Sequence, residues 1–139
     1  MEKIIIVRNN RKSAFRHPQA YGFTSVTCPD LFFDNSEGFF SHSNGTIVCN
    51  QDAIIHAHAL FGVDSIAHYY TITINNAYGN SEIFYSNATS IGGYSGQTSN
   101  YFKVKKGDVI SLGFGLKNSF SIAAKDLYAE LDVRLVCVL

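Results

Sequence analysis

Apolar and polar residues alternate along much of this chain, in short stretches that turn residues separate. Phe102 and Val104 recur at every second position before a turn, and the apolar positions 110, 112 and 114 do so after it. This period is typical of a half-buried β-strand. The turn itself contains Gly107, which can take a positive φ, and Asp108, which can hydrogen-bond its own backbone. The pattern predicts a strand, a tight turn and a second strand.

Strand-like stretches of this kind recur along the whole chain. The expected strands cover residues 4–7, 23–26, 31–34, 38–40, 46–49, 54–61, 68–75, 81–85, 100–105, 109–116 and 127–139. No stretch has a clear helical period, although residues 122–127 could form one turn. Many short strands with regular turns predict an all-β sandwich or barrel. About ten strands fit a jelly-roll β-sandwich of two sheets best.

The C-terminal end is an unbroken apolar run from Leu135 to Leu139. Strands that are covered on both faces have continuous apolar sequences of this kind, whereas half-exposed strands alternate. We therefore expect this strand to be covered. Because the domain is small, a partner chain is expected to do part of the covering.

Composition and charge narrow the function. The 139 residues correspond to one domain, and the 11 basic and 11 acidic residues cancel, so the basic surface of a nucleic-acid binder is missing. Charged residues make up 16% of the chain, and there are 8 tyrosines and 11 phenylalanines. Few charges and many aromatic residues suit a protein interface, and they suit a well-filled sandwich core equally well.

The cysteines and the N-terminus bear on location. Cys28, Cys49 and Cys137 have neither disulfide-framework nor metal-site spacing, so we expect buried free thiols. The first residues do not read as a signal peptide, and no apolar run reaches the length of a membrane span. We expect a protein that is made in a cytosol and either stays there or leaves it within an assembly.

Residues 1–20 differ from the rest because five of the eleven basic residues lie in the first 16 positions. One interpretation is an arm that anchors the protein to an acidic partner surface, with residues 21–139 as the head domain. The anchoring residues would then be Ile5, Arg8, Arg11, Lys12 and Arg16. The alternative is that the apolar residues 4–7 form the first strand of the sandwich, followed by a solvated basic loop.

Several short motifs occur in a characteristic order: Phe33-Asp34, then Gly45-Thr46-Ile47-Val48-Cys49, the strands 53–59 and 69–76, and Lys105-Lys106-Gly107-Asp108-Val109-Ile110. This order resembles the globular head of C1q-like proteins, in the C1q/tumour-necrosis-factor jelly-roll superfamily. The resemblance covers residues 23–139 and implies a homotrimer. The chain departs from the family in its last strand, Leu131-Asp132-Val133-Arg134-Leu135, and has no collagen-like repeat or calcium-binding acidic cluster.

His56 and His58 are two positions apart on an expected strand, so their side chains project from the same face. They could bind a metal or an anion, but no third ligand is evident beyond His42 or His68, and we expect no metal. Positions 55, 57, 59 and 61 suit the core. We therefore expect His56 and His58, with Leu135 and Leu139, at the trimer interface. Acidification below about pH 6 should weaken such a trimer.

Tyrosines are interspersed with Asn, Ser, Thr and Gly between residues 75 and 101. Tyr78, Tyr85, Tyr94 and Tyr101 are candidates for ligand-binding loops that contact a host-surface glycan or protein. The alternative is an ordinary jelly-roll loop. Asn44 and Asn87 match the glycosylation pattern, which we regard as chance in a chain without a signal peptide.

The sequence has no nucleophile motif, paired-carboxylate spacing or phosphate loop, so we expect no enzymatic activity and no cofactor. We expect a trimeric binding or structural protein. The most specific hypothesis, which rests on fold analogy, is a bacteriophage virion surface component such as a head fibre, capsid decoration or tail-tip protein. A free-standing bacterial or extracellular ligand-binding or signalling module is the alternative. A cupin-like enzyme using His56 and His58 is a third possibility. Nucleic-acid and membrane partners are not expected.

Overall fold

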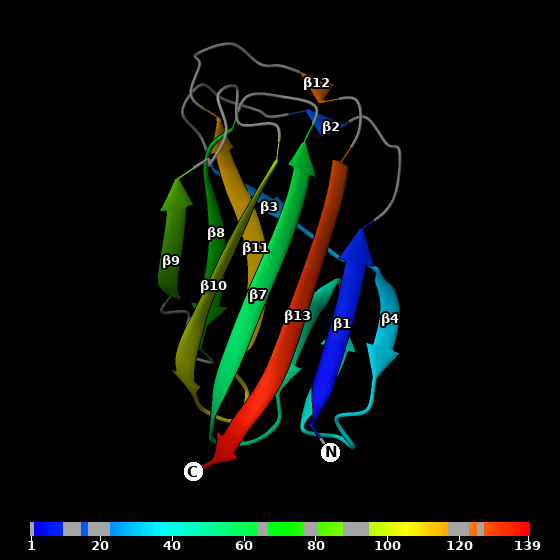
Figure 1. Cartoon of the computed structure of the whole chain (residues 1–139), viewed down its shortest axis with the longest axis vertical. Coiled ribbons are helices and arrows are strands. Elements are labelled where there is room, and N and C mark those ends of the chain that lie inside the picture. Colours follow the sequence, from blue (N-terminus) through cyan, green and yellow to red (C-terminus); the bar gives the residue numbers. More distant parts are fainter. Residues whose placement is uncertain are drawn as a thin grey trace.

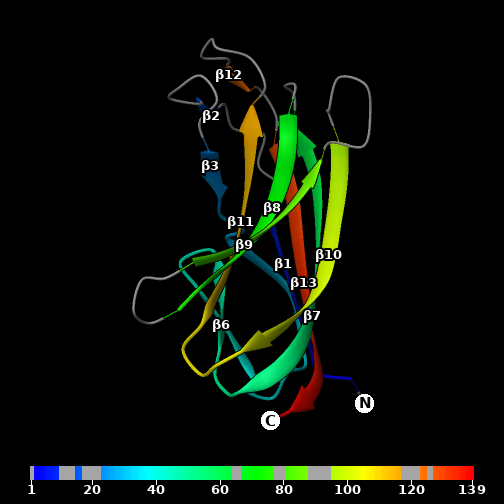
Figure 2. The same ribbon diagram turned by 90° about the vertical axis from the view of Figure 1, so that its left-hand side faces the viewer.

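Two antiparallel β-sheets face each other in the computed structural model, which describes residues 2–9, 15–16, 23–63, 67–76, 81–87, 95–116, 123–124 and 127–139 (Figures 1 and 2). The first sheet has the order β10 (Ser95–Val104), β7 (Ala53–Val63), β13 (Leu127–Val138), β1 (Ile4–Asn9) and β4 (Asp30–Asp34). The second has the order β5 (Phe40–Ser43), β6 (Thr46–Cys49), β11 (Val109–Leu116), β8 (Ala67–Asn75) and β9 (Ser81–Asn87), and β3 (Phe23–Val26) pairs with β11. Two short strands, β2 (Phe15–Arg16) and β12 (Ala123–Ala124), pair with each other.

One core lies between the sheets, and strand β7 shows how the sequence builds it. Ile55, Ala57 and Ala59 are completely buried, whereas His56 and His58 between them are only half-buried. Alternation follows because successive strand residues point to opposite faces. The predicted division of this strand into a core face and an outer face is confirmed. The second sheet contributes Ile72, Ile110 and Leu112, among others.

The N-terminus belongs to the sandwich. Strand β1 is paired with β13 on one side and β4 on the other, and Ile5 and Val7 are completely buried. Ile5 therefore faces the core, which corrects its assignment as an anchoring residue on an arm. Arg8 also lies in β1, whereas Arg16 lies in the short strand β2. Arg11 and Lys12 fall outside the described residues.

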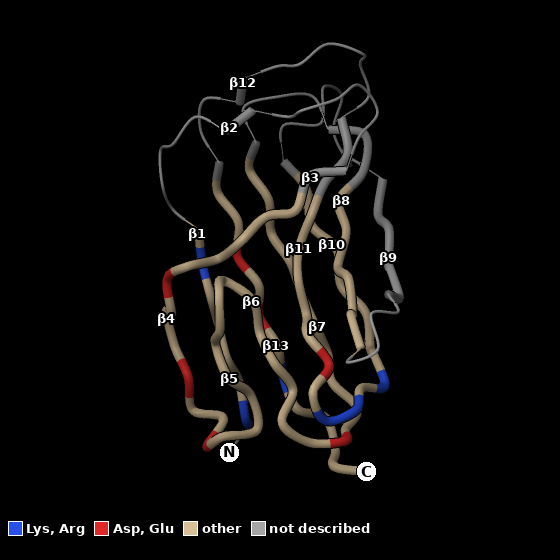
Figure 3. The backbone as a smooth tube through the Cα atoms, turned by 180° about the vertical axis from the view of Figure 1, so that it is seen from behind, with Lys and Arg blue, Asp and Glu red and all other residues tan. Residues whose placement is uncertain are grey.

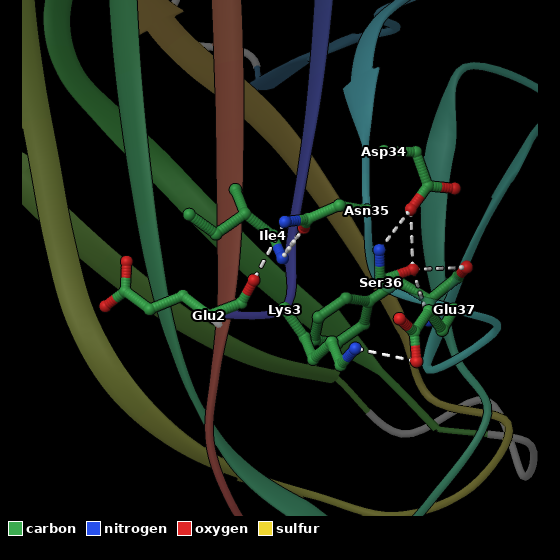
Figure 4. Close-up of polar contacts among 8 residues, drawn as sticks. Glu2, Lys3, Ile4, Asp34, Asn35, Ser36 and Glu37 are labelled. Carbon is green, nitrogen blue, oxygen red and sulfur yellow. Dashed lines mark hydrogen bonds and ion pairs between the residues drawn. The ribbon is translucent and has the colours of Figure 1, made fainter.

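Two hydrogen bonds and one ion pair join the start of β1 to the turn after β4 (Figure 4). The backbone N–H of Ile4 donates to Asn35 Oδ1 at 2.7 Å, and Asn35 Nδ2 donates to the carbonyl of Glu2 at 2.9 Å. Lys3 Nζ lies 2.7 Å from Glu37 Oε2. Every residue from Glu2 to Ile4 thus has a partner in the neighbouring turn. In the structure, residues 4–9 form the first strand of the sandwich, which is the alternative interpretation of the N-terminus.

The observed strands agree with the sequence pattern at most positions and differ at a few. The expected strand at 38–40 is a turn, in which Glu37 and Gly38 have positive φ values of 52° and 87°, and β5 starts only at Phe40. Ala123 and Ala124, where a helical turn was considered, form strand β12. β10 begins at Ser95, five positions earlier than expected. The C-terminal run is not covered within one chain, since Val136, Val138 and Leu139 are 49%, 45% and 57% exposed.

Candidate functional site on the outer face of the five-stranded sheet

We use the term outer face for the side of the five-stranded sheet that points away from the core. It carries Ile4, Ile6 and Arg8 of β1, His56 and His58 of β7, Tyr101 of β10, and Tyr128, Glu130, Asp132, Arg134 and Val136 of β13. These residues come from strands far apart in the sequence that the antiparallel pairing places side by side. Both predicted interface histidines lie on it.

Glu130 is the centre of a hydrogen-bonded group on this face. The hydroxyl of Tyr128 donates to Glu130 Oε2 at 2.6 Å, and Arg8 Nε donates to the same oxygen at 3.3 Å. Burial opposes ionisation of Glu130, but hydrogen bonds from Tyr128 and Asp132 and the charge of Arg8 outweigh it and lower the pKa of its carboxyl. Glu130 is therefore a stable anion at neutral pH. Arg8, which was assigned to anchoring, is held within the sheet by this contact.

Asp132 lies next to Glu130 on the same face, and its pKa is shifted in the opposite direction. Burial, together with a hydrogen bond to Glu130 and the charge of that residue, raises the pKa of Asp132 from 3.8 to about 6. Its Oδ1 atom is buried and has no hydrogen-bond partner among the described residues, while Oδ2 lies 3.9 Å from His58 Nδ1. The ring of His58 continues the group to β10, because its Nε2 lies 3.2 Å from Gln97 Oε1.

The raised pKa of Asp132 predicts a specific pH dependence. The folded protein holds this proton more tightly than the unfolded chain, so stability falls as the pH rises from about 4 to above 6. We expect Asp132→Asn to stabilise the fold at about pH 7.5 by about 1 kcal/mol, because partial exposure reduces the roughly 3 kcal/mol that two pKa units represent. Thermal unfolding across pH measures this. The gain should vanish below about pH 4.

His56 packs against Tyr101 at the other edge of the outer face. Their ring centroids are 4.8 Å apart at an interplanar angle of 60°, and Tyr101 is 64% exposed. Burial, and then the charges of Arg134 and His58, lower the pKa of His56. His56 is thus a neutral ring at pH 7 that is tilted against Tyr101 and adds a ring contact surface to the outer face.

Only Tyr101 of the four predicted ligand-binding tyrosines has a described side chain, and it is on a strand rather than in a loop. It lies directly opposite His56 in the β10–β7 pairing, which moves it from the expected ligand-binding loops to the outer face. Tyr85 lies in β9, with a side chain outside the described set. Tyr78 and Tyr94 fall outside the described residues.

A hollow of about 640 Å³ opens on the outer face near the chain ends and is lined by Glu2, Lys3, His56, Tyr101, Arg134, Leu135 and Val136. The guanidinium of Arg134 lies 3.6 Å from the Glu2 carboxylate across it. Leu135 packs partly against the core, whereas Leu139 is exposed and its N–H donates to the carbonyl of Asp52 at 3.0 Å. The predicted interface residues His56, Leu135 and Leu139 therefore gather at one end of the molecule.

The remaining candidate groups have structural explanations. Cys28 and Cys49 are buried free thiols, as predicted, and burial raises the pKa of each to about 12. Cys137 is exposed, contrary to the prediction, because the register shift after Leu135 places it opposite Ile54, whose side chain points away from the core. His42 Nε2 lies 2.7 Å from the carbonyl of Cys28. In the described part of the chain, no group of three His, Cys, Asp or Glu residues could hold a metal ion.

Solved structures similar to this chain all have the same fold. The globular domain of zebrafish complement 1qA protein aligns over 100% of both chains with a TM-score of 0.70 and 16% identity. The PRD1 vertex protein P5 aligns over 97% of both chains with a TM-score of 0.69 and 9% identity. Murine APRIL aligns over 98% of this chain and 100% of its own, with a TM-score of 0.66 and 10% identity.

These similarities establish the fold, which is the jelly roll of the C1q and tumour-necrosis-factor proteins, as the sequence motifs predicted. At such low identities they establish nothing further about this chain. No family model matches the sequence, and no curated protein matches it. No helix in the described ranges is long and apolar enough to cross a membrane.

Proposed function

We propose that this chain is a homotrimeric, non-enzymatic binding or structural protein exposed on a virion surface. The observation that carries the proposal is the exposed apolar C-terminal end, formed by Val136 and Val138 of β13 and by Leu139 after it, beside the exposed ring of Tyr101. Monomeric proteins rarely leave such side chains together in water. The trimer buries this end together with the predicted interface residues His56, His58, Leu135 and Leu139.

The virion location is supported by the similarity to the PRD1 vertex protein P5, a phage protein that this chain matches over almost its full length. In this role the head faces the host, and a surface glycan or protein is the ligand of the predicted binding residues Tyr78, Tyr85 and Tyr94, while Tyr101 belongs to the outer face. Arg11, Lys12 and Arg16 remain the proposed contacts to an acidic capsid or tail protein. The similarity to the complement 1qA domain and to APRIL supports the second candidate, a free-standing ligand-binding module.

Trimer formation can be tested by light scattering and by unfolding at several protein concentrations. We expect a threefold mass and an unfolding midpoint that rises with concentration, because dissociation is coupled to unfolding. Val138→Glu should shift the protein towards monomer, since it places like charges in the buried end, whereas Lys3→Gln at the rim should not. A parent protein that stays a stable monomer at micromolar concentration would contradict the proposal.

The virion role needs a separate measurement. Antibody against the chain should label purified particles, and particles made without it should adsorb to the host more slowly. Labelling confined to the culture medium would favour the free-standing alternative. Acidification below about pH 6 should loosen the trimer, because a protonated His56 places a positive charge beside Arg134, and the His56→Asn variant should be less sensitive than the parent.

A further inference from the structure

Strand β4 is unlike the other strands of the first sheet because all five of its positions are exposed. It lies at one edge of the sheet, and Leu31, Phe32 and Phe33 are 51%, 57% and 45% exposed. Asp30 and Asp34 stand at its two ends. We call these five residues the β4 edge. An exposed apolar edge strand can pair with another chain, so we expect a partner to cover this edge.

A β-bulge turns the aromatic residues of the β4 edge towards the outer face. Phe33 lies opposite Ile6 and Leu31 lies opposite Val7, so Phe32 is an extra residue in the pairing. Bulges re-aim side chains in this way. The Arg8 guanidinium carbon lies 3.4 Å from the centre of the Phe32 ring, and Arg8 belongs to the outer face. Phe32 and Phe33 thus border the same surface as the histidines.

The other edge of the same sheet is β10, and its chemistry is the opposite. Tyr101 is 64% exposed, and Lys103 and Lys105 are exposed beside it. We call these three residues the β10 edge. Within the described residues, neither lysine takes part in an ion pair. The nearby carboxylates are engaged in the adjoining turn: Asp108 accepts the N–H of Lys105, and Asp52 accepts that of Lys106, both at 2.9 Å.

The two edges are complementary to each other and not to themselves. Figure 3 shows acidic positions along β4 on one side of the molecule and basic positions at the lower end of the opposite side, and Figure 1 shows β4 and β10 at the two borders of one sheet. An isologous dimer would place β4 carboxylates against β4 carboxylates, which is unfavourable. A heterologous contact joins unlike edges, and it closes into a ring when the rotation between successive copies divides a full turn.

We infer that the trimer closes by packing the β4 edge of each copy against the β10 edge of the next. This inference rests on the proposed trimer and goes further by naming its two unlike surfaces. Phe32 and Phe33 then meet Tyr101 of the neighbouring copy. The carboxylate of Asp34, whose Oδ1 already accepts from the N–H and the hydroxyl of Ser36 at 2.8 and 2.6 Å, keeps its negative charge and lies near Lys103 or Lys105. The aromatic contact excludes water and the charges set the direction of the ring.

Cross-linking distinguishes this arrangement from other trimers. In a Cys137→Ser background, Phe33→Cys/Tyr101→Cys is treated with a short bis-maleimide, with each single cysteine variant as the control. We expect covalent dimers and trimers from the double variant and no linkage from either control. A trimer by light scattering whose double variant does not cross-link, or whose single variants do, overturns the inference but leaves the proposed function intact. A protein that is a monomer in solution would contradict both the inference and the proposed function.

Charge reversal tests the same contact without cysteines. Lys103→Glu/Lys105→Glu should raise the concentration at which half the trimer dissociates by about tenfold, because it places negative charges opposite the aspartates of the β4 edge. Added salt should weaken the parent trimer and strengthen this variant. Circular dichroism should be unchanged, because both side chains are exposed. A variant trimer with the parent's stability and salt response would overturn the inference.

Discussion

Deletion of residues 2–9 is expected to leave a chain that does not fold. It removes Ile5 and Val7, which are completely buried, and each buried aliphatic side chain contributes about 2 to 4 kcal/mol. It also removes the strand between β13 and β4, so that β4 loses its partner β1 in the described sheet and β13 gains an open edge. Because domains are stable by about 5 to 15 kcal/mol, we expect aggregation, measured as the soluble fraction after expression.

A matched pair of substitutions separates the core role of β1 from a surface role. Ile5→Ala should lower the free energy of unfolding by about 3 kcal/mol, because Ile5 is buried between the sheets. Ile6→Ala, on the outer face, should lower it by less than about 1 kcal/mol. A soluble, folded trimer of residues 10–139 would contradict this account and return the N-terminus to the role of an anchoring arm.

The β-sandwich could be predicted from the sequence because period-two patterns and turn residues are local signals. Gly107 has a φ of 93° in its turn, as a glycine between two strands suggested. The N-terminal strand was harder to assign. Ile4 to Val7 is apolar throughout, and this pattern fits both an added strand on a partner and a strand inside the sheet. Pairing with β13, more than 120 positions away in sequence, decides between them, and no local pattern contains it.

The outer face could be predicted only in part, for a similar reason. His56 and His58 could be predicted because residues two positions apart on a strand project from the same face. Tyr128, Glu130, Asp132 and Arg134 follow the same spacing on the last strand, and this alternation of polar residues was the available signal. The apolar run from Leu135 to Leu139 that follows it is the stronger local pattern, and it predicts a covered strand. Their contacts with Arg8 and His58 depend on strand pairing, which composition and period do not specify.

Gly96→Ala is expected to destabilise the fold by about 3 kcal/mol. A Cβ atom at position 96 would lie 2.3 Å from Cε2 and 2.6 Å from Cδ2 of Tyr70. Tyr70 cannot move easily, because it is completely buried and its ring stacks on Phe61 at a centroid distance of 4.7 Å. Gly96 lies opposite Phe61 in the β10–β7 pairing. The missing side chain thus lets the Tyr70 ring of the second sheet fit against β10.

Gly62→Ala is the matched control, since among the described residues its added Cβ would meet the Tyr128 Cβ at an ordinary 3.7 Å. We expect its unfolding free energy to stay within about 1 kcal/mol of the parent. Tyr70→Leu should relieve the clash, so the loss in Gly96→Ala/Tyr70→Leu should be smaller than the sum of the two single losses by more than about 1 kcal/mol. Strictly additive losses would mean that the ring does not restrict position 96. Because β10 also carries Tyr101 and Lys103, Gly96→Ala should weaken the trimer as well, whereas Gly62→Ala should leave it intact.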